Sequence, residues 1–265
     1  VSETMQKRYD ITITNAKEFI NQCKIQKVNF HPIGVVQAWS PKSMKKAAKE
    51  LVSMGYDYIA IGGLVPLDID TCEEIVNAVR EEIGFDIRMH LLGFAKAKQL
   101  ERFVKYKITS FDSTSPMIKS FKDSTQNYLT PEKYYTAIRI PSSDSTASLK
   151  RTISSGVIDQ KTAQTLERKA LDTIRAYDKD QATLDETLNA LENYEKIFRD
   201  KVPIDRYRDI LSTKYWQKCQ CEVCQSVKIE TIIFRNSNRN RRRGFHNLWQ
   251  FQRELEELKR GHNIC

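Results

Sequence analysis

Between residues 33 and 112 the sequence alternates short apolar runs with longer segments of helical pattern. The apolar runs cover residues 34–37, 58–63, 89–93 and 108–112. Runs of this length and character predict strands that are buried on both faces, as in a parallel sheet. Repeated strand and helix units therefore predict an α/β fold, either a (β/α)8 barrel or an open doubly wound sheet.

The segments between the apolar runs carry helix start and stop signals. The first has Ser40 as N-cap, Pro41 at the first helical position and Gly55 as the stop. In the second, the spacing of Thr71 and Glu74 predicts a capping box at the start of an amphipathic helix. The pattern of the first 116 residues is thus typical of successive βα units.

A set of small and polar residues falls where the apolar runs end. In both candidate folds the carboxyl ends of parallel strands form one edge, and function collects there. Taken singly, each of these residues is more simply explained as a turn residue, whereas the whole set predicts a functional rim. Its members are Gln37, Gly62, Gly63, Gly93 and Asp112.

Asp112 stands in the stretch SFDSTSP, residues 110–116, where the last apolar run meets a Ser/Thr loop. A carboxylate at such a rim has the chemistry to attack an anomeric carbon and form a covalent glycosyl intermediate. A strand-end aspartate considered alone is more often a helix cap or a loop anchor. Both interpretations stand at this point.

After Pro116 the pattern changes to a polar, tyrosine-bearing segment followed by helical periodicity. One helix is predicted around residues 166–177 and another around 184–198, each with its apolar residues on one face. We therefore expect a mainly helical insertion over residues 117–214, between βα units in residues 1–116 and a cysteine-bearing segment in residues 215–265.

Three cysteines crowd into six positions of the last segment, and a histidine follows. Cys219, Cys221 and Cys224 with His246 make a tetrahedral ligand set that leaves no open position, which predicts a structural zinc ion. The other cysteines, at positions 23, 72 and 265, are scattered. This distribution favours a metal site over a disulfide framework, and hence a reducing compartment.

The chain is basic, with 43 Lys and Arg against 34 Asp and Glu, a net charge of +9 and a pI near 9.2. This balance favours a polyanionic partner, although an ordinary basic protein is the alternative. An arginine run has the composition to neutralise nucleic-acid phosphates, and a solvated loop is the equally simple explanation. The run comprises Arg235, Arg239, Arg241, Arg242 and Arg243.

The N-terminus is polar, and the apolar runs are far shorter than the roughly 20 residues of a membrane span. We therefore expect a soluble, cytoplasmic protein with no membrane partner.

Taken in order, these motifs resemble the tRNA-guanine transglycosylase superfamily. The matching stretches are PIGVVQAWS, IAIGGLVPL, MHLLG, SFDSTSP, CQCEVC and HNLW. The resemblance implies a (β/α)8 barrel with a structural zinc insertion. It also implies that Asp112 attacks C1′ of a guanosine nucleotide and expels guanine, after which a 7-deazaguanine base attacks the intermediate. By the same resemblance Gln37, Gly62, Gly63 and Leu64 contact the heterocycle, and Gly93 lies beside the base pocket.

Within the superfamily, the long segment between Asp112 and the cysteines looks most like the DpdA-type members. These place a 7-deazaguanine, typically the 7-cyano form, in DNA, so DNA is the expected partner. The alternatives are the same exchange on tRNA, or a non-catalytic nucleic-acid-binding subunit. The resemblance also implies a homodimer or a partner protein.

The sequence departs from the superfamily pattern in one respect. Four barrel strands are predicted where the family barrel has eight, and the family's upstream acids for proton transfer have no counterpart. We therefore expect the chain to be the C-terminal part of a longer protein and to hold the C-terminal half of the barrel.

Overall fold

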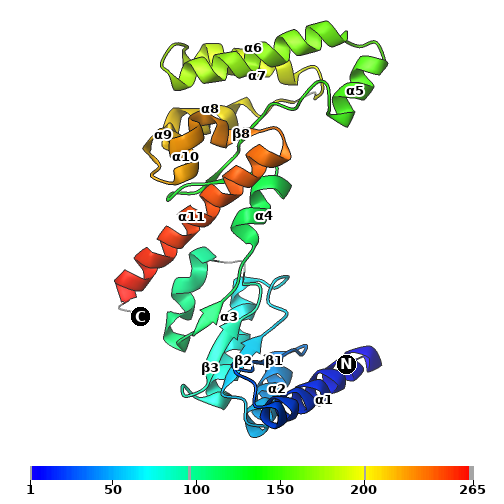
Figure 1. Ribbon diagram of the computed structural model, residues 1–265, viewed down its shortest axis with the longest axis vertical. Helices are drawn as coiled ribbons and strands as arrows, with labels where there is room; N and C mark the ends of the chain where they lie inside the picture. Colours follow the sequence, from blue (N-terminus) through cyan, green and yellow to red (C-terminus); the bar gives the residue numbers. More distant parts are fainter. Residues whose placement is uncertain (1, 95–96, 200, 263–265) are drawn as a thin grey trace. The chain divides into compact units, whose positions relative to one another are not determined.

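The computed structural model describes residues 2–94, 97–199 and 201–262 (Figure 1). The chain divides into two compact units, each with its own core. Unit 1 comprises Val1–Thr114 and Leu258–Cys265, and unit 2 comprises Ser115–Glu257.

Unit 1 has the alternating strand and helix order that the sequence predicts. Its elements are α1 (Glu3–Gln26), β1 (Gly34–Val36), α2 (Pro41–Ser53), β2 (Tyr58–Ile61), α3 (Ile69–Ile83), β3 (Arg88–Leu91), the 3-10 helix η1 (Ala97–Tyr106) and β4 (Ser110–Phe111). The four strands form one parallel sheet in the order β1-β2-β3-β4. The α/β class with a parallel sheet is thereby confirmed, and it is consistent with the (β/α)8 barrel.

The two faces of this sheet differ. On one face Val36, Ile59, Ile61, Met89 and Leu91 are fully buried. The alternate residues of the same strands point to the other face, which remains partly exposed in β1, β3 and β4. The prediction of burial on both faces is therefore wrong for these strands. Four strands make an open sheet, so the face that a closed barrel turns inward is only partly covered.

Helix α2 begins as predicted, with Ser40 as N-cap and Pro41 at the first helical position. For α3 the capping prediction is wrong. Its N-cap is Asp68, whose carboxylate accepts hydrogen bonds from the backbone N–H and the hydroxyl of Thr71. Aspartate is as good an N-cap as serine or threonine. With Asp68 as the N-cap, the helix begins at Ile69, two residues before Thr71.

Helix α1 was not anticipated from the sequence. Only Tyr9, Ile20 and Cys23 are buried in it, too few for a continuous apolar stripe. Contacts distant in sequence hold it in place. Tyr56 donates a hydrogen bond to the carbonyl of Ala16 at 2.7 Å, and the Tyr9 ring meets the Trp39 ring edge-on.

Unit 2 is built from helices and very short strands. Its elements are α4 (Ser115–Lys122), β5 (Tyr128–Leu129), β6 (Tyr134–Tyr135), β7 (Ile138–Arg139), α5 (Ala147–Ser154), α6 (Gln160–Asp178), α7 (Leu184–Glu195), α8 (Ile204–Thr213), α9 (Tyr215–Lys218), α10 (Glu222–Val227), the 3-10 helix η2 (Lys228–Ile232), β8 (Ile233–Phe234) and α11 (Ser237–His262), which begins here. Helices α6 and α7 lie side by side (Figure 1). One apolar core takes residues from β5, α6, α7, α8 and the cysteine segment alike, so the helical segment and the cysteines share one folded unit.

Candidate active site and metal centre

Asp112 lies directly after β4, at the carboxyl edge of the sheet. Its Oδ1 accepts two hydrogen bonds, one from the backbone N–H of Gly93 at 2.8 Å and one from Nε2 of His90 at 3.1 Å. The side chain of Asp112 is 56% exposed, whereas that of His90 is 15% exposed. The carboxylate is thus held at one oxygen and open to solvent, as a nucleophile requires.

The surroundings of Asp112 keep it ionised. The hydrogen bond from the Gly93 amide is the main cause that lowers its pKa below the ordinary aspartate value. Slight burial raises the pKa, and the hydrogen bond from His90 lowers it again. Asp112 is therefore a carboxylate at neutral pH.

The other residues of the predicted rim follow the ends of the neighbouring strands. The Gly62 amide donates to the carbonyl of Val36 and so continues the ladder between β1 and β2. A Cβ on Gly62 would lie 3.2 Å from Cγ of Gln37, so glycine leaves room for that exposed side chain. Gly93 has φ +63°, the left-handed conformation that turns its N–H toward Asp112.

Gly63 and Leu64 lie in the loop that follows β2. Gly63 is exposed with φ +80°, and a Cβ added to it would meet nothing within 4 Å. The Leu64 side chain is only 1% exposed and belongs to the core. Any contact of Leu64 with a ligand would therefore involve its backbone.

Sequence reasoning missed three polar residues behind Asp112, namely His90, Ser110 and Tyr58. Nδ1 of His90 lies 2.5 Å from Oγ of Ser110, which lies 2.5 Å from the hydroxyl of Tyr58. His90 interrupts an apolar run and pairs in register with Ser110, two residues before Asp112. A polar residue at that place in a strand was the available signal.

The second site lies in unit 2, where Cys219, Cys221, Cys224 and His246 converge. All four are buried, and their ligand atoms lie within 4.8 Å of one another. Nδ1 of His246 is 3.4 to 3.6 Å from the three sulfurs. Zinc bonds of about 2.0 Å to nitrogen and 2.3 Å to sulfur at tetrahedral angles put these atoms about 3.5 Å apart, so the residues fit the ion.

The surroundings of His246 fix which nitrogen faces the sulfurs. Nε2 lies 2.7 Å from the carbonyl oxygen of Leu129, so Nε2 carries the proton and donates it, and Nδ1 is left unprotonated for a metal. The imidazole also stacks on Tyr128 with 4.4 Å between ring centroids. Hydrogen bonds with Cys219 and Cys221, followed by burial, raise the pKa of the Cys224 thiol. A raised pKa disfavours the thiolate, which is the form that binds a metal. A divalent cation bound there would offset this effect because it stabilises all three thiolates.

Comparison with known proteins identifies the family of the chain. The family model described as queuine tRNA-ribosyltransferase matches residues 1–261. The chain belongs to this family. The predicted resemblance to the tRNA-guanine transglycosylase superfamily is thereby confirmed.

A curated relative of this queuine tRNA-ribosyltransferase family member is the DNA-guanine transglycosylase of Salmonella montevideo. The two are 40% identical over 257 residues, which cover 95% of the chain and 61% of the relative. The chain thus spans about three fifths of the length of the relative.

The arginine run of this family member divides into ion-paired, buried and exposed residues. Arg235 pairs with Glu167, and Arg239 pairs with Glu230. Arg243 is fully buried, and its guanidinium donates to the carbonyls of Ser120 and Ile233 and to the side chain of Asn240. The prediction of a phosphate contact is therefore wrong for Arg243, because its charge serves to satisfy buried carbonyls. Arg241 and Arg242 are exposed.

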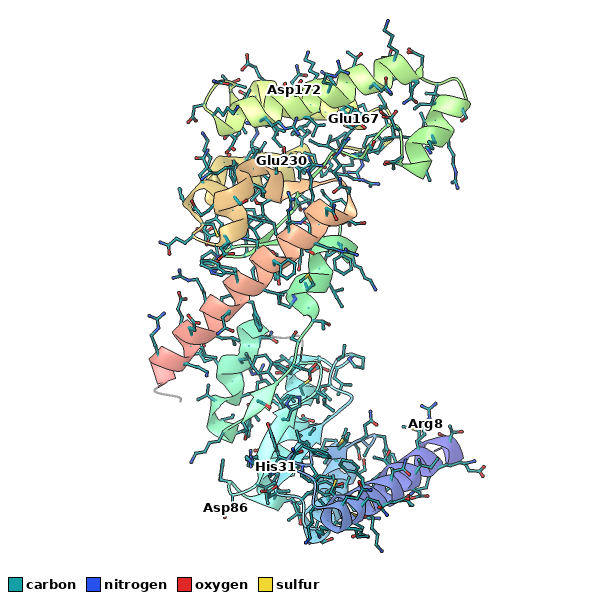
Figure 2. The ribbon with its side chains drawn as sticks, viewed as in Figure 1. Arg8, His31, Asp86, Glu167, Asp172 and Glu230 are labelled. Atoms are coloured by element: carbon teal, nitrogen blue, oxygen red, sulfur yellow. The ribbon has the colours of Figure 1, made fainter. Side chains whose placement is uncertain are left out.

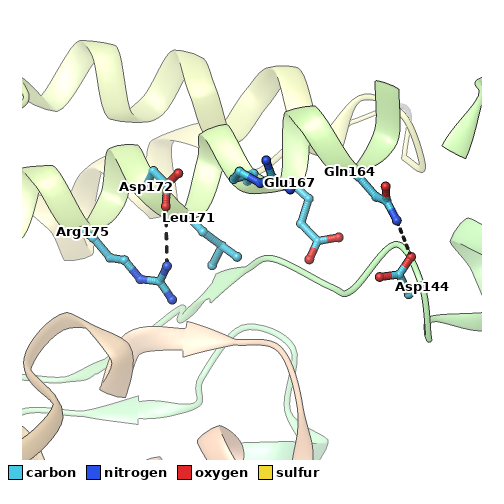
Figure 3. A pocket seen from close by; sticks show the side chains of 7 residues that line it. Asp144, Gln164, Glu167, Leu171, Asp172 and Arg175 are labelled. Carbon is cyan, nitrogen blue, oxygen red and sulfur yellow. Dashed lines mark hydrogen bonds and ion pairs between the residues drawn. The ribbon is translucent and has the colours of Figure 1, made fainter. Parts of the chain in front are cut away.

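Unit 2 also contains a polar cavity of about 270 Å³ along α6 (Figure 3). Its acids already have partners. Asp144 accepts from Gln164 at 2.9 Å, Asp172 pairs with Arg175, and Glu167 accepts from the backbone N–H of Ser143. We assign no ligand to this cavity.

In the described part of the chain, no helix combines the length and the apolar character that crossing a membrane requires.

Proposed function

We propose that this chain provides the nucleophile of a transglycosylase that exchanges guanine in DNA for a 7-deazaguanine base. The observation that carries the proposal is Asp112, an exposed carboxylate kept ionised at the carboxyl edge of a parallel sheet. Membership of a ribosyltransferase family and the 40% identity to a DNA-guanine transglycosylase support this reaction and substrate.

The reaction takes place in two displacements. A carboxylate oxygen of Asp112 bonds to C1′ while the bond from C1′ to N9 of guanine breaks, and its electron pair leaves with the guanine, which takes up a proton. N9 of the incoming 7-deazaguanine, such as the 7-cyano form, then attacks C1′, loses its proton and releases the carboxylate. Two inversions at C1′ retain the configuration of the nucleotide.

The rim residues Gln37, Gly62, Gly63 and Leu64 are proposed to contact the base, with Gly93 beside it. In the structure a Cβ added to Gly62 would meet the Gln37 side chain, and the Gly93 amide donates a hydrogen bond to Asp112. A target guanine must leave the base stack to reach such a rim, at a cost of a few kcal/mol, so single-stranded or flexible sites should react faster.

Zinc is proposed for the Cys3His site, where it would hold four points of unit 2 together. The exposed pair Arg241 and Arg242 is proposed to contact phosphates. We expect the full-length protein to act in the cytoplasm, as a homodimer or with a partner protein.

The test is a covalent adduct between the full-length protein and DNA that survives denaturation when no incoming base is supplied. We expect Asp112→Asn to abolish the adduct and to slow base exchange by about 10⁴-fold or more, because the nucleophile is lost. Asp86→Asn is the matched control. Asp86 is an exposed aspartate before β3, at the opposite edge of the sheet (Figure 2). An adduct that persists in Asp112→Asn would show that another residue is the nucleophile.

The family description favours tRNA as a second candidate substrate. Incubation of the full-length protein with labelled guanine and either nucleic acid separates the two. Label in DNA alone supports the proposal, and label in tRNA alone contradicts it. A protein that binds DNA but incorporates no label into either would be a non-catalytic subunit.

A further inference from the structure

A series of hydrogen bonds runs from Asp112 across three neighbouring strands. His90 of β3 contacts Asp112 through Nε2 and Ser110 of β4 through Nδ1, and Ser110 contacts the hydroxyl of Tyr58 of β2. The parallel register places Tyr58, His90 and Ser110 on the same face of the sheet as Asp112. The series is therefore a product of strand order, and its groups are held by the sheet itself.

The hydrogen bonds have a single consistent direction. The ionised carboxylate of Asp112 only accepts, so Nε2 of His90 carries a proton and donates it. In the neutral imidazole Nδ1 is then an acceptor, so the Ser110 hydroxyl donates a hydrogen bond to it, and Ser110 in turn accepts one from the Tyr58 hydroxyl. The Arg88 guanidinium lies 4.8 Å from the centre of the Tyr58 ring and holds that end of the series.

Both described donors reach the same oxygen of Asp112. Gly93 and His90 each donate to Oδ1, which leaves Oδ2 outside both bonds. If Oδ2 bonds to C1′, Oδ1 becomes the carbonyl oxygen of the resulting ester. When the second displacement breaks the bond between C1′ and Oδ2, its electron pair stays with the carboxylate, and resonance shares the negative charge with Oδ1, where two hydrogen-bond donors are already in place. Donors arranged in advance of charge development lower a barrier without reorganisation.

We propose that His90 is a positioning residue that directs Oδ2 of Asp112 toward C1′ and assists the departure of Asp112 from the intermediate. Ser110 and Tyr58 hold His90 in the tautomer that makes this possible. The proposal deepens the proposed function and rests on it.

The kinetic test uses the full-length protein and follows formation and breakdown of the DNA adduct separately. We expect His90→Leu to slow breakdown by a 7-deazaguanine base by about 10- to 100-fold, as loss of an orienting partner does, with little change in KM for the base. His90→Gln should recover most of the rate, because its Nε2 amide donates from nearly the same place. Asp86→Asn is again the control, since Asp86 is exposed and precedes β3 at the opposite edge of the sheet.

A spectroscopic test reports the tautomer without turnover. The full-length protein is labelled with ¹⁵N-histidine, and the imidazole nitrogen resonances that disappear in His90→Gln are those of His90. We expect Nε2 of His90 to be protonated and Nδ1 to accept. Ser110→Ala should produce a mixture of tautomers and a smaller kinetic loss than His90→Leu.

The outcomes separate the two proposals. If the unaltered protein forms no adduct, the proposed function fails and the role of His90 fails with it. If the adduct forms and depends on Asp112 while His90→Leu breaks it down at the normal rate, only the role of His90 is overturned. A protonated Nδ1 in the resting protein, or no recovery in His90→Gln, overturns it as well.

Discussion

Two histidines, one in each unit, follow the same rule in opposite surroundings. His246 of unit 2 is fully buried, its Nε2 fixed by the Leu129 carbonyl and its Nδ1 turned to three sulfurs. His90 of unit 1 lies at a partly open face, its Nδ1 fixed by Ser110 and its Nε2 turned to an exposed carboxylate. In both, a hydrogen bond to one ring nitrogen decides what the other nitrogen does.

The two sites differ in the surroundings of the second ring nitrogen, which is Nδ1 in His246 and Nε2 in His90. Around His246 the three cysteines are buried, and with the histidine they make a closed set, so a metal ion bound there would have no position for substrate. Around Asp112 the carboxylate is exposed, so a substrate has access to it. We therefore expect substitutions at the site of unit 2 to lower stability, and substitutions at the site of unit 1 to lower the rate of the reaction.

The largest effect on stability should follow from removing a cysteine or the metal from the Cys3His site of unit 2. We expect Cys224→Ser, or removal of zinc by a chelator, to unfold unit 2, because structural zinc contributes about 10–16 kcal/mol in small zinc domains and whole proteins are stable by only about 5–15 kcal/mol. Metal analysis should find one zinc per chain, and hydrogen exchange should rise through residues 115–257 when it is lost.

Cys72→Ser is the control for that change. Cys72 is a buried cysteine of unit 1 whose thiol bonds the Leu64 carbonyl, and serine keeps the donor. Hydrogen exchange in unit 2 should not change in this variant. A metal-free protein with a protected unit 2 would contradict the structural role of the site.

The next effect distinguishes buried from exposed arginines within unit 2. We expect Arg243→Ala to lower the free energy of unfolding by about 3 kcal/mol or more, because each buried acceptor left without a donor costs about 1–3 kcal/mol. The double variant Arg241→Ala and Arg242→Ala should leave stability within about 0.5 kcal/mol. Denaturant unfolding measures both.

The double variant should instead change DNA binding. Loss of two phosphate contacts lowers the slope of log affinity against log salt by about 1.8 on duplex DNA. Binding titrations at several salt concentrations measure this slope. An unchanged slope would mean that Arg241 and Arg242 are a solvated surface and that the phosphate proposal for them is wrong.

The sequence was sufficient for features that depend on pattern and spacing. Strand ends placed Gln37, Gly62 and Asp112 at one edge because parallel strands share their direction, and the spacing of the cysteines identified three of the residues that converge in unit 2. Both follow from rules of period and coordination that hold before any tertiary contact forms.

Features that depend on distant partners were not predictable. Nothing local in the arginine run separates Arg243, which meets carbonyls from α4 and β8, from the exposed Arg242. Likewise, the role of His90 depends on Ser110, twenty residues away on the next strand. The division of burial between the two sheet faces also required the completed sheet.

The smallest effect concerns the start of α3, where sequence and structure disagree. We expect Asp68→Ala to lower the free energy of unfolding by about 1 kcal/mol, because its carboxylate accepts from both Thr71 donors at 2.7 and 2.9 Å. Glu74→Ala, which removes the acid of the predicted capping box, should cost less than about 0.5 kcal/mol. Thermal or denaturant unfolding of the two variants decides between the two caps. A larger loss of stability in Glu74→Ala would show that the capping box of Thr71 and Glu74 starts the helix after all.

The loop from Gly63 to Asp68 joins the rim to α3, so a frayed start of this helix also loosens the rim glycine Gly63. Asp68→Ala should therefore also slow base exchange by the full-length protein by a measurable amount, whereas Glu74→Ala should not.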